Sequence, residues 1–151
     1  DRYPGLKRRS IWKTRYGVFA SPAYLKAHGT PDHPDQLAEH KVIGYLYNQP
    51  SNVLVLQDSN GEHIYATPHC QIKTVAGMVE LAEAGLGFIN APVESGHIQR
   101  LLQQNKLAPV LQDYWWQDAE VCAYYHPSTP TQAKVRVFLD FFLAKREEWQ
   151  F

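Results

Sequence analysis

The chain has 151 residues with fifteen basic and fifteen acidic side chains, so its formal net charge is zero. This length suffices for one full hydrophobic core, and one domain is the expectation. A balanced charge disfavours direct binding to a nucleic-acid backbone, which requires a basic surface. The main basic concentration, residues 7–9 with Lys13 and Arg15, is interpreted as a solvated chain end.

The sequence shows no membrane span and no export signal. No stretch approaches the roughly 20 apolar residues that a spanning helix needs, and no basic segment leads into an apolar one. The first residue is Asp1 rather than methionine, which is typical of a fragment or a processed product. Cys70 and Cys122 lie in separate apolar segments without a CxxC motif, so we expect buried free thiols.

The first predicted elements are a strand over residues 15–20 and a short helix directly after it. Ser21 is a favourable N-cap, Pro22 fits the first helical turn, and Gly29 can end the helix with a positive φ. A second short helix is expected to begin at Pro34.

The next part of the chain contains a predicted buried strand and a hairpin. Residues 41–47 form the apolar run of the buried strand. Residues 53–57 and 62–66 flank a short polar segment in which Asn60 and Gly61 suit the two positive φ values of a type I′ turn. We therefore expect an antiparallel hairpin at the surface.

The second half of the chain alternates between strands and helices. After a strand over residues 70–73, the apolar spacing changes to that of a helix ending at Gly85, with an inward face formed by Val75, Met78, Val79 and Ala82. Another helix is expected to start at Pro92 and to point Ile98, Leu101 and Leu102 inward. The remaining elements are expected at residues 86–91 (strand), 105–113 (loop or short strand), 121–125 (strand) and 131–145 (the longest helix).

This alternation predicts the fold class. Strands that alternate with helices indicate parallel pairing and an α/β fold, with the hairpin as an antiparallel addition.

Catalytic and metal-binding motifs are absent from the sequence. The seven histidines form neither HxxxH nor HExxH, and the neighbours His69 and Cys70 would point to opposite faces of a strand. No GxSxG marks a nucleophile, and Ser21 is better explained as a helix cap. Gly85 and Gly87 follow a helix rather than open one, so a C-cap and a close-packing position explain them better than a dinucleotide loop. We expect no catalytic residue, no metal and no cofactor.

Two strand ends are the candidate ligand-binding positions. In open α/β folds, small molecules bind beyond the carboxyl ends of strands and at helix N-termini. At one end, Tyr45 or Tyr47 could stack on an aromatic ring, or could pack in the core instead. At the other, the Thr74 hydroxyl and the first N–H groups of a helix could hold a carboxylate, or Thr74 could simply cap that helix. With Ser21 at a third helix N-terminus, the candidate residues are Ser21, Tyr45, Leu46, Tyr47, Thr74 and Val75.

A resemblance to a known family rests on one segment. Residues 18–40 read VFASPAYLKAHGTPDHPDQLAEH. This segment resembles the ligand-sensing domain of LysR-type transcriptional regulators, where the pattern ASPAYL…HG.P..P.DL..H follows the first crossing into one half of the domain. The resemblance implies a periplasmic-binding-protein-like fold of type 2, in which two crossing strands join two α/β lobes and a ligand lies in the cleft between them.

The resemblance also implies a domain organisation. Residues 1–151 would be an effector-binding domain fragment that is truncated at its amino-terminal side. Residues from about 21 to 117 would form one complete lobe, and residues from about 121 to 151 would supply a crossing strand and the last helix of the other lobe. The apolar face of that helix, with Phe138, Leu139 and Phe142, would pack on the missing lobe.

A function follows from the same resemblance. The chain would sense a small anionic effector and control transcription through a separate helix-turn-helix domain, which alone would contact DNA. Such a regulator would be a cytoplasmic homodimer or tetramer without catalytic activity. A solute-binding protein of a transport system shares the fold and is the nearest alternative, which an export signal on the full gene would favour. An enzyme of unknown class is the other alternative, which turnover dependent on a histidine or serine would favour.

Overall fold

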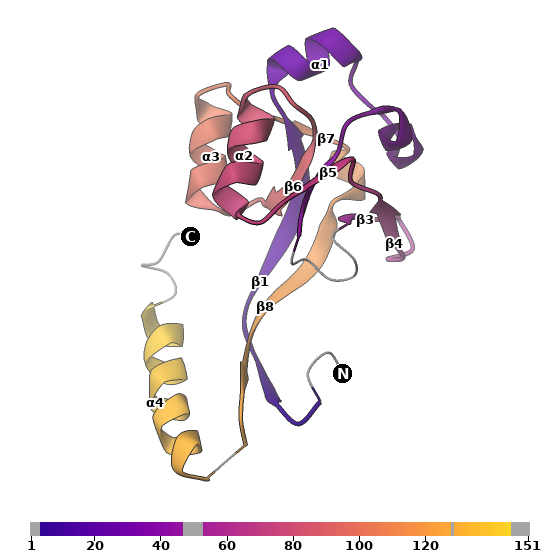
Figure 1. Ribbon diagram of the computed structural model, residues 1–151. Helices are drawn as coiled ribbons and strands as arrows, with labels where there is room; N and C mark the ends of the chain where they lie inside the picture. Colours follow the sequence, from indigo (N-terminus) through magenta and orange to yellow (C-terminus); the bar gives the residue numbers. More distant parts are fainter. Residues whose placement is uncertain (1–3, 47–52, 128, 146–151) are drawn as a thin grey trace.

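The computed structural model describes residues 4–46, 53–127 and 129–145. The strands are β1 (Lys7–Ala20), β2 (Ile43–Tyr45), β3 (Leu54–Gln57), β4 (His63–Ala66), β5 (Cys70–Ile72), β6 (Ile89–Pro92), β7 (Ala108–Val110) and β8 (Trp116–Tyr125). The helices are α1 (Pro22–His28), α2 (Val75–Glu83), α3 (Gly96–Gln103) and α4 (Thr129–Lys145), with 3₁₀ helices η1 (Pro34–Glu39) and η2 (Gln112–Tyr114). Two long strands, β1 and β8, run side by side out of an α/β body and lead to α4 (Figure 1).

The long strand β1 organises the main sheet. Its second half pairs with β6 on one side and with β7 on the other, and along most of its length it also pairs with β8. The β1–β8 ribbon runs from the pair Lys7 and Tyr125 to the pair Tyr16 and Trp116. Its register shifts twice, between Ser10 and Trp12 and between Thr14 and Tyr16.

The prediction of mainly parallel pairing is wrong. All three partners of β1 run antiparallel to it, whereas β2 and β5 form the parallel pair, extended by a parallel bridge between Val42 and Phe88. The physical reason is that β1 runs from the ribbon into the α/β body, whereas its neighbours β6, β7 and β8 run in the opposite direction, toward the ribbon. Alternation of strands and helices does not report that reversal.

Hydrophobic side chains fill both faces of this sheet. Along β1, Phe19 packs with α2 and α3 in one core cluster, and Val18 and Ala20 pack with α1, η1 and β3 in the other. This alternation follows from the two-residue period of a strand. The body is therefore layered, with α2 and α3 on one face of the sheet and α1, η1 and the β3–β4 hairpin on the other.

The two short helices predicted after the first strand are confirmed. Ser21 caps α1 because its Oγ accepts a hydrogen bond from the Tyr24 N–H at 3.1 Å. Pro22 is the first helical residue, and Gly29 ends the helix at φ 88°. The short helix that begins at Pro34 is the 3₁₀ helix η1.

The hairpin is confirmed, but its turn is not type I′. Strands β3 and β4 pair antiparallel, and Gly61 has φ 84°, whereas Asn60 is not among the residues with positive φ. The Asp58 carboxylate instead accepts hydrogen bonds from the N–H groups of Asn60 and Glu62, at 2.9 and 2.8 Å. This side chain stabilises a three-residue loop with one left-handed residue, a common alternative to the two-residue turn.

Four further expectations need correction or a limit. Strand β2 is shorter than predicted, and Tyr47 lies outside the described residues. Pro92 belongs to β6 rather than to a helix, because it pairs with Tyr16 of β1 and the next N–H, that of Val93, donates to the Arg15 carbonyl. The helix α3 begins only at Gly96. Val75 is exposed at the start of α2. The two cysteines are free thiols, but Cys70 is exposed and Cys122 partly so, since neither side chain reaches the core clusters.

The basic residues near the start of β1 are mostly paired. Four of them contact carboxylates on other elements: Arg8 with Glu120, Arg9 with Asp140, Lys13 with Asp118 and Arg15 with Glu94. The cluster is therefore a set of ion pairs that join β1 to β8, α4 and the segment after β6, rather than an unpaired chain end. Because these side chains are exposed, solvent screening keeps the contribution of each pair to stability small.

Candidate effector-binding site

The parallel pair β2 and β5 brings the two predicted strand ends together. Tyr45 lies opposite Ile72 in the register, and the Leu46 N–H donates to the Ile72 carbonyl at 2.9 Å. Two residues after Ile72, Thr74 begins α2. The carboxyl ends of both strands and the N-terminus of α2 thus meet at one edge of the α/β body.

Thr74 is the N-cap of α2. Its Oγ1 accepts a hydrogen bond from the Gly77 N–H at 3.2 Å, and its carbonyl accepts from the Met78 N–H at 3.1 Å. The N–H groups of Val75 and Ala76, in the same first turn, have no intrahelical acceptor. They carry the positive end of the helix dipole, to which an anion is attracted.

Gly77 is required for this arrangement, and sequence reasoning missed it. A Cβ atom at this position would lie 2.8 Å from Ile72 Cδ1 and 2.9 Å from Thr74 Oγ1. Both distances are shorter than real Cβ contacts, so a larger residue would displace Thr74 or Ile72. A glycine three residues after a threonine cap is the signal that could have indicated it.

The side chains at this edge form a wall that is apolar on its inner side. Tyr45 and Ile72 are half-buried and pack against the core cluster that includes Met78. Leu46 is also half-buried, whereas Thr74 and Val75 are exposed. An exposed hydrogen-bonding residue beside a half-buried aromatic ring suits a ligand with an anionic group on a flat apolar body.

Ser21 does not belong to this group. A Cβ atom built on Gly85, just after α2, would lie 3.4 Å from Ser21 Oγ, so Ser21 lies at the C-terminal end of the helix that Thr74 begins. The nine residues of α2 separate the two by about 13 Å. Ser21 is also buried, and its hydroxyl is engaged in capping α1.

A histidine that sequence reasoning assigned no role stabilises the start of the β2–β5 pair. The Val42 N–H donates to His69 Nδ1 at 3.2 Å, and the His69 N–H donates to the Val42 carbonyl at 2.8 Å. His69 therefore aligns both strands before they reach Tyr45 and Ile72. No local pattern indicates this contact, because its partners lie 27 residues apart.

The ribbon is fixed to the α/β body by one carboxylate. Glu94 accepts hydrogen bonds from Thr14 Oγ1 at 2.8 Å, from Arg15 Nε at 2.8 Å and from the Arg15 N–H at 3.1 Å. Burial alone would raise the Glu94 pKa, but the hydrogen bonds from Arg15 and Thr14 outweigh it and hold the pKa below 4.5.

Among the described residues, no group of three histidine, cysteine or acidic side chains could hold a metal ion. No helix within that part of the chain is long and apolar enough to cross a bilayer.

The family model named LysR substrate binding domain matches residues 1–147. The chain belongs to this family. The HTH-type transcriptional regulator CrgA of Neisseria meningitidis is 28% identical over 140 residues, which are 92% of this chain and 46% of that protein. The chain spans about half the length of the curated relatives it matches.

Solved structures of the family have the same fold. The regulatory domain of Neisseria meningitidis CrgA matches with a TM-score of 0.69 and 26% identity, over 94% of this chain and 69% of that chain. A full-length AphB variant matches with a TM-score of 0.75 and 25% identity, over 95% of this chain and 48% of that chain. The predicted fold class, α/β and periplasmic-binding-protein-like, is therefore confirmed.

Proposed function

We propose that this chain is the effector-sensing part of a LysR-type transcription regulator. It binds a small anionic molecule at the edge where Tyr45, Leu46, Thr74 and Val75 meet, with Tyr47 as a further contact. The observation that carries the proposal is the convergence of the β2 and β5 carboxyl ends on the N-terminus of α2. The anion takes the first N–H groups of α2, and Tyr45 contacts the apolar body of the ligand.

Occupancy of this site controls transcription through a helix-turn-helix domain outside this chain, and only that domain contacts DNA. The coupling free energy comes from different effector affinities in two arrangements of the regulator, which acts in the cytoplasm as a dimer or tetramer. Several of the relatives are named as HTH-type transcriptional regulators, which favours this role over transport or catalysis.

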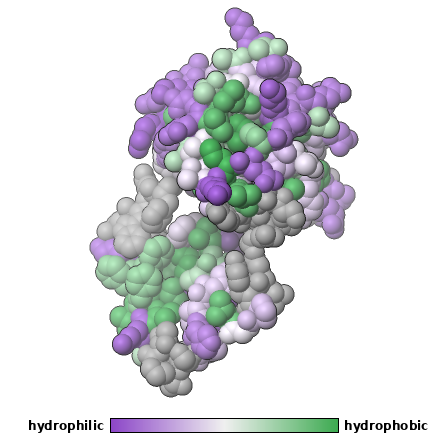
Figure 2. All heavy atoms as spheres, in the orientation of Figure 1, coloured by the Kyte–Doolittle hydropathy of each residue, from purple (hydrophilic) through white to green (hydrophobic). Residues whose placement is uncertain are grey.

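The domain organisation is part of the proposal. The α/β body, residues from about 21 to 117, is one complete lobe. The apolar face predicted for this helix is only partly right, because Leu139 is buried and the Phe142 ring stacks on Trp12 of β1 at 5.9 Å. The outer face of α4 instead exposes 70% of Val137, 60% of Phe138 and 55% of Phe141, more apolar surface than a terminal helix normally shows to water. Figure 2 also shows hydrophobic residues gathered at the lower left, where Figure 1 places α4. This face packs on a second lobe formed by a segment of the protein outside this chain.

Calorimetric titration of the intact regulator with aromatic carboxylates, benzoate first, tests the site. Thr74→Ala removes one hydrogen-bonding group and is expected to weaken binding by about 1 kcal/mol, roughly fivefold. Tyr45→Ala removes the stacking surface, with a loss of about 0.5–1.5 kcal/mol. Thr30→Ala, at an exposed threonine outside this site, is the matched control.

Thermal melts of each variant separate lost binding from lost folding, since Thr74 also caps α2. Unchanged affinity in both Thr74→Ala and Tyr45→Ala would show that the effector binds elsewhere.

A further inference from the structure

Within the described part of the chain, β4 pairs only with β3, so its other edge carries no strand there. The Asp58 N–H donates to the Glu62 carbonyl at 2.9 Å, so these two residues form a hydrogen-bonded pair at the turn of the hairpin. Hydrogen-bonded and non-bonded pairs alternate along an antiparallel ladder, which makes the pair of Val55 and Tyr65 non-bonded. The Val55 N–H accordingly points away from β4, to Asn90 Oδ1 at 3.2 Å. By the same geometry, the N–H and carbonyl of Tyr65 point away from β3.

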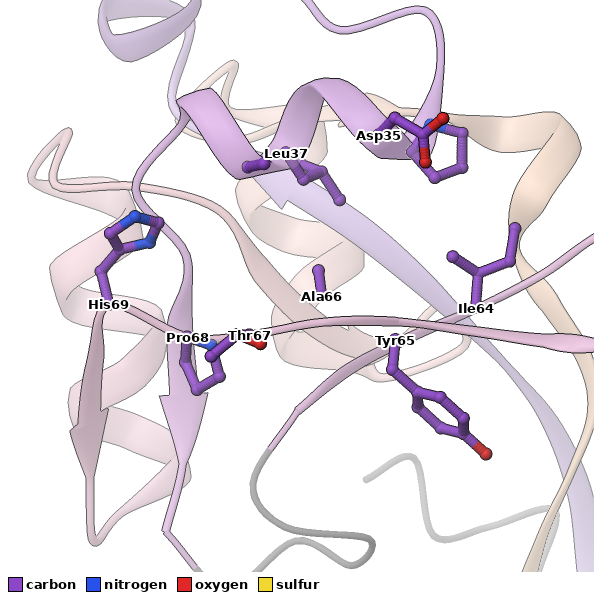
Figure 3. Close-up of a pocket in the computed structure, with 10 residues that line it drawn as sticks. Asp35, Leu37, Ile64, Tyr65, Ala66, Thr67, Pro68 and His69 are labelled. Atoms are coloured by element: carbon purple, nitrogen blue, oxygen red, sulfur yellow. The ribbon is translucent and has the colours of Figure 1, made fainter.

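A pocket of about 600 Å³ lies along this strand, between it and η1. Figure 3 shows Leu37 pointing from η1 toward the strand, Ile64 and Ala66 pointing back toward η1, and Tyr65 pointing the other way. Leu37 is itself buried, so the accessible apolar floor is formed by the half-buried Ile64 and Ala66. The pocket combines this floor with the outward-facing peptide groups of Tyr65. An extended peptide can bond to such peptide groups, and its alternate side chains can cover such a floor.

The charges around the pocket indicate which segment fits. Asp35 lines the pocket with 88% of its side chain exposed, and none of the other lining residues is a lysine, an arginine or an acid. Asp58 and Glu62 follow at the hairpin end of β4. A second copy of this chain would bring the same carboxylates to the edge, whereas a basic segment would be attracted.

We propose that β4 accepts an extended segment of a partner protein as an added strand. The segment has small apolar residues at alternate positions, which cover the half-buried Ile64 and Ala66, and lysine or arginine at its ends. The residue opposite Tyr65 exchanges backbone hydrogen bonds with it. The proposal does not depend on the effector site, because the β3–β4 hairpin and η1 lie on the other face of the sheet from α2.

The docked segment would lie close to the β1–β8 ribbon. The His63 ring lies 4.9 Å from the ring of Trp116, and the Gln117 N–H donates to Gln57 Oε1 at 3.2 Å. Both contacts join the hairpin to the first residues of β8. A partner on β4 is thus placed where the ribbon enters the α/β body.

Fluorescence anisotropy with the labelled, blocked peptide Lys-Val-Thr-Val-Lys and the full-length protein tests the proposal. With threonine opposite Tyr65, the threonine N–H faces β4 and so do the N–H groups of the two lysines, whereas the N–H groups of the two valines point away from it. N-methylation of the threonine is expected to weaken binding at least tenfold. N-methylation of either valine adds the same group on the outward side and should leave affinity within about twofold.

Protein variants give a second, independent measurement. Tyr65→Pro removes the outward N–H and should weaken binding about tenfold, because proline is tolerated at a strand edge but cannot donate. Tyr65→Ala keeps that N–H and should bind nearly as the original protein does. If Tyr65→Pro does not fold, the comparison between the peptide methylated at threonine and the peptide methylated at a valine still tests whether backbone hydrogen bonds to β4 hold the segment.

Three results would overturn the proposal. The first is no saturable binding of the unmethylated peptide at millimolar concentration. The second is equal loss of affinity for both methylated peptides, which would indicate recognition of side chains alone. The third is a change in sedimentation of Tyr65→Pro without any peptide binding, which would assign the edge to a second copy of this chain.

Discussion

The buried side chain of Asn90 is expected to make one of the main polar contributions to the free energy of unfolding of the α/β body. Its Oδ1 accepts from the Val55 N–H at 3.2 Å, and its Nδ2 donates to the Gly17 carbonyl at 3.0 Å. It therefore joins β6 to β3 and β1 with hydrogen bonds that no ladder supplies. Asn90→Leu leaves the buried Val55 N–H without a partner, at a cost of about 1–3 kcal/mol. It also removes one hydrogen bond from the Gly17 carbonyl, which still pairs with Ala91 in the ladder, at a cost of about 0.5–1.5 kcal/mol. We expect a total loss of about 2–4 kcal/mol in the free energy of unfolding.

Equilibrium unfolding in urea, followed by tryptophan fluorescence, measures this loss. Trp115 lies in the core cluster that contains Ile89 and Ala91 of β6, and it contributes to this signal together with the other three tryptophans of the chain. At about 2–4 °C per kcal/mol for a chain of this size, the melting temperature should fall by roughly 5–15 °C. A loss below about 0.5 kcal/mol for Asn90→Leu would refute the reasoning, since it would mean that the Val55 N–H finds another partner.

Two other measurements follow from contacts at the ribbon and α4. Because the pKa of Glu94 is lower in the folded protein than its usual value of 4.5, its contribution to stability is present above about pH 4.5 and is lost as the pH falls through the folded pKa. Glu94→Gln should therefore flatten this part of the acid denaturation curve measured in urea, and an unchanged curve would exclude the contribution. The exposed face of α4 should make the isolated 151-residue chain self-associate with rising concentration in sedimentation experiments, and Phe138→Asp with Phe141→Asp should abolish this. A monomer at every concentration with α4 folded would contradict the proposed second lobe.

Local rules predicted the parts of the fold that depend on neighbouring residues. The cap at Ser21, the end of α1 at Gly29 and, apart from the exposed Val75, the inward face of α2 depend on residues within one turn of each other, so local sequence patterns indicate them. The prediction that Gly87 is a close-packing position is also confirmed, because a Cβ atom there would clash with the Lys41 carbonyl oxygen.

The errors arose where a distant partner decides the structure. Pro92 is a plausible first residue of a helix, but the backbone of β1 holds it in a strand. The Asp58 side chain changed the turn around Asn60. The direction of β1 relative to β6, β7 and β8 depends on how the chain enters the α/β body, which no window of the sequence shows.

The candidate site was predictable only in part for the same reason. Thr74 and Tyr45 could be recognised because each lies where a strand ends, and the adjacency of β2 and β5 then brings them together. Placing Ser21 correctly required the direction of α2 relative to β1. The role of His69 required knowing that Val42 lies beside it.

The two register shifts in the β1–β8 ribbon have a mechanical consequence. A strand bends and twists most where an extra residue interrupts the ladder, and it resists bending where the ladder is regular. The ribbon therefore bends and twists most at two points, Ser10–Trp12 and Thr14–Tyr16. The second point is held by the hydrogen bonds from Thr14 and Arg15 to Glu94, so it fixes the angle at which the ribbon leaves the α/β body. Together the two points set the angle between α4 and the strand ends near Thr74.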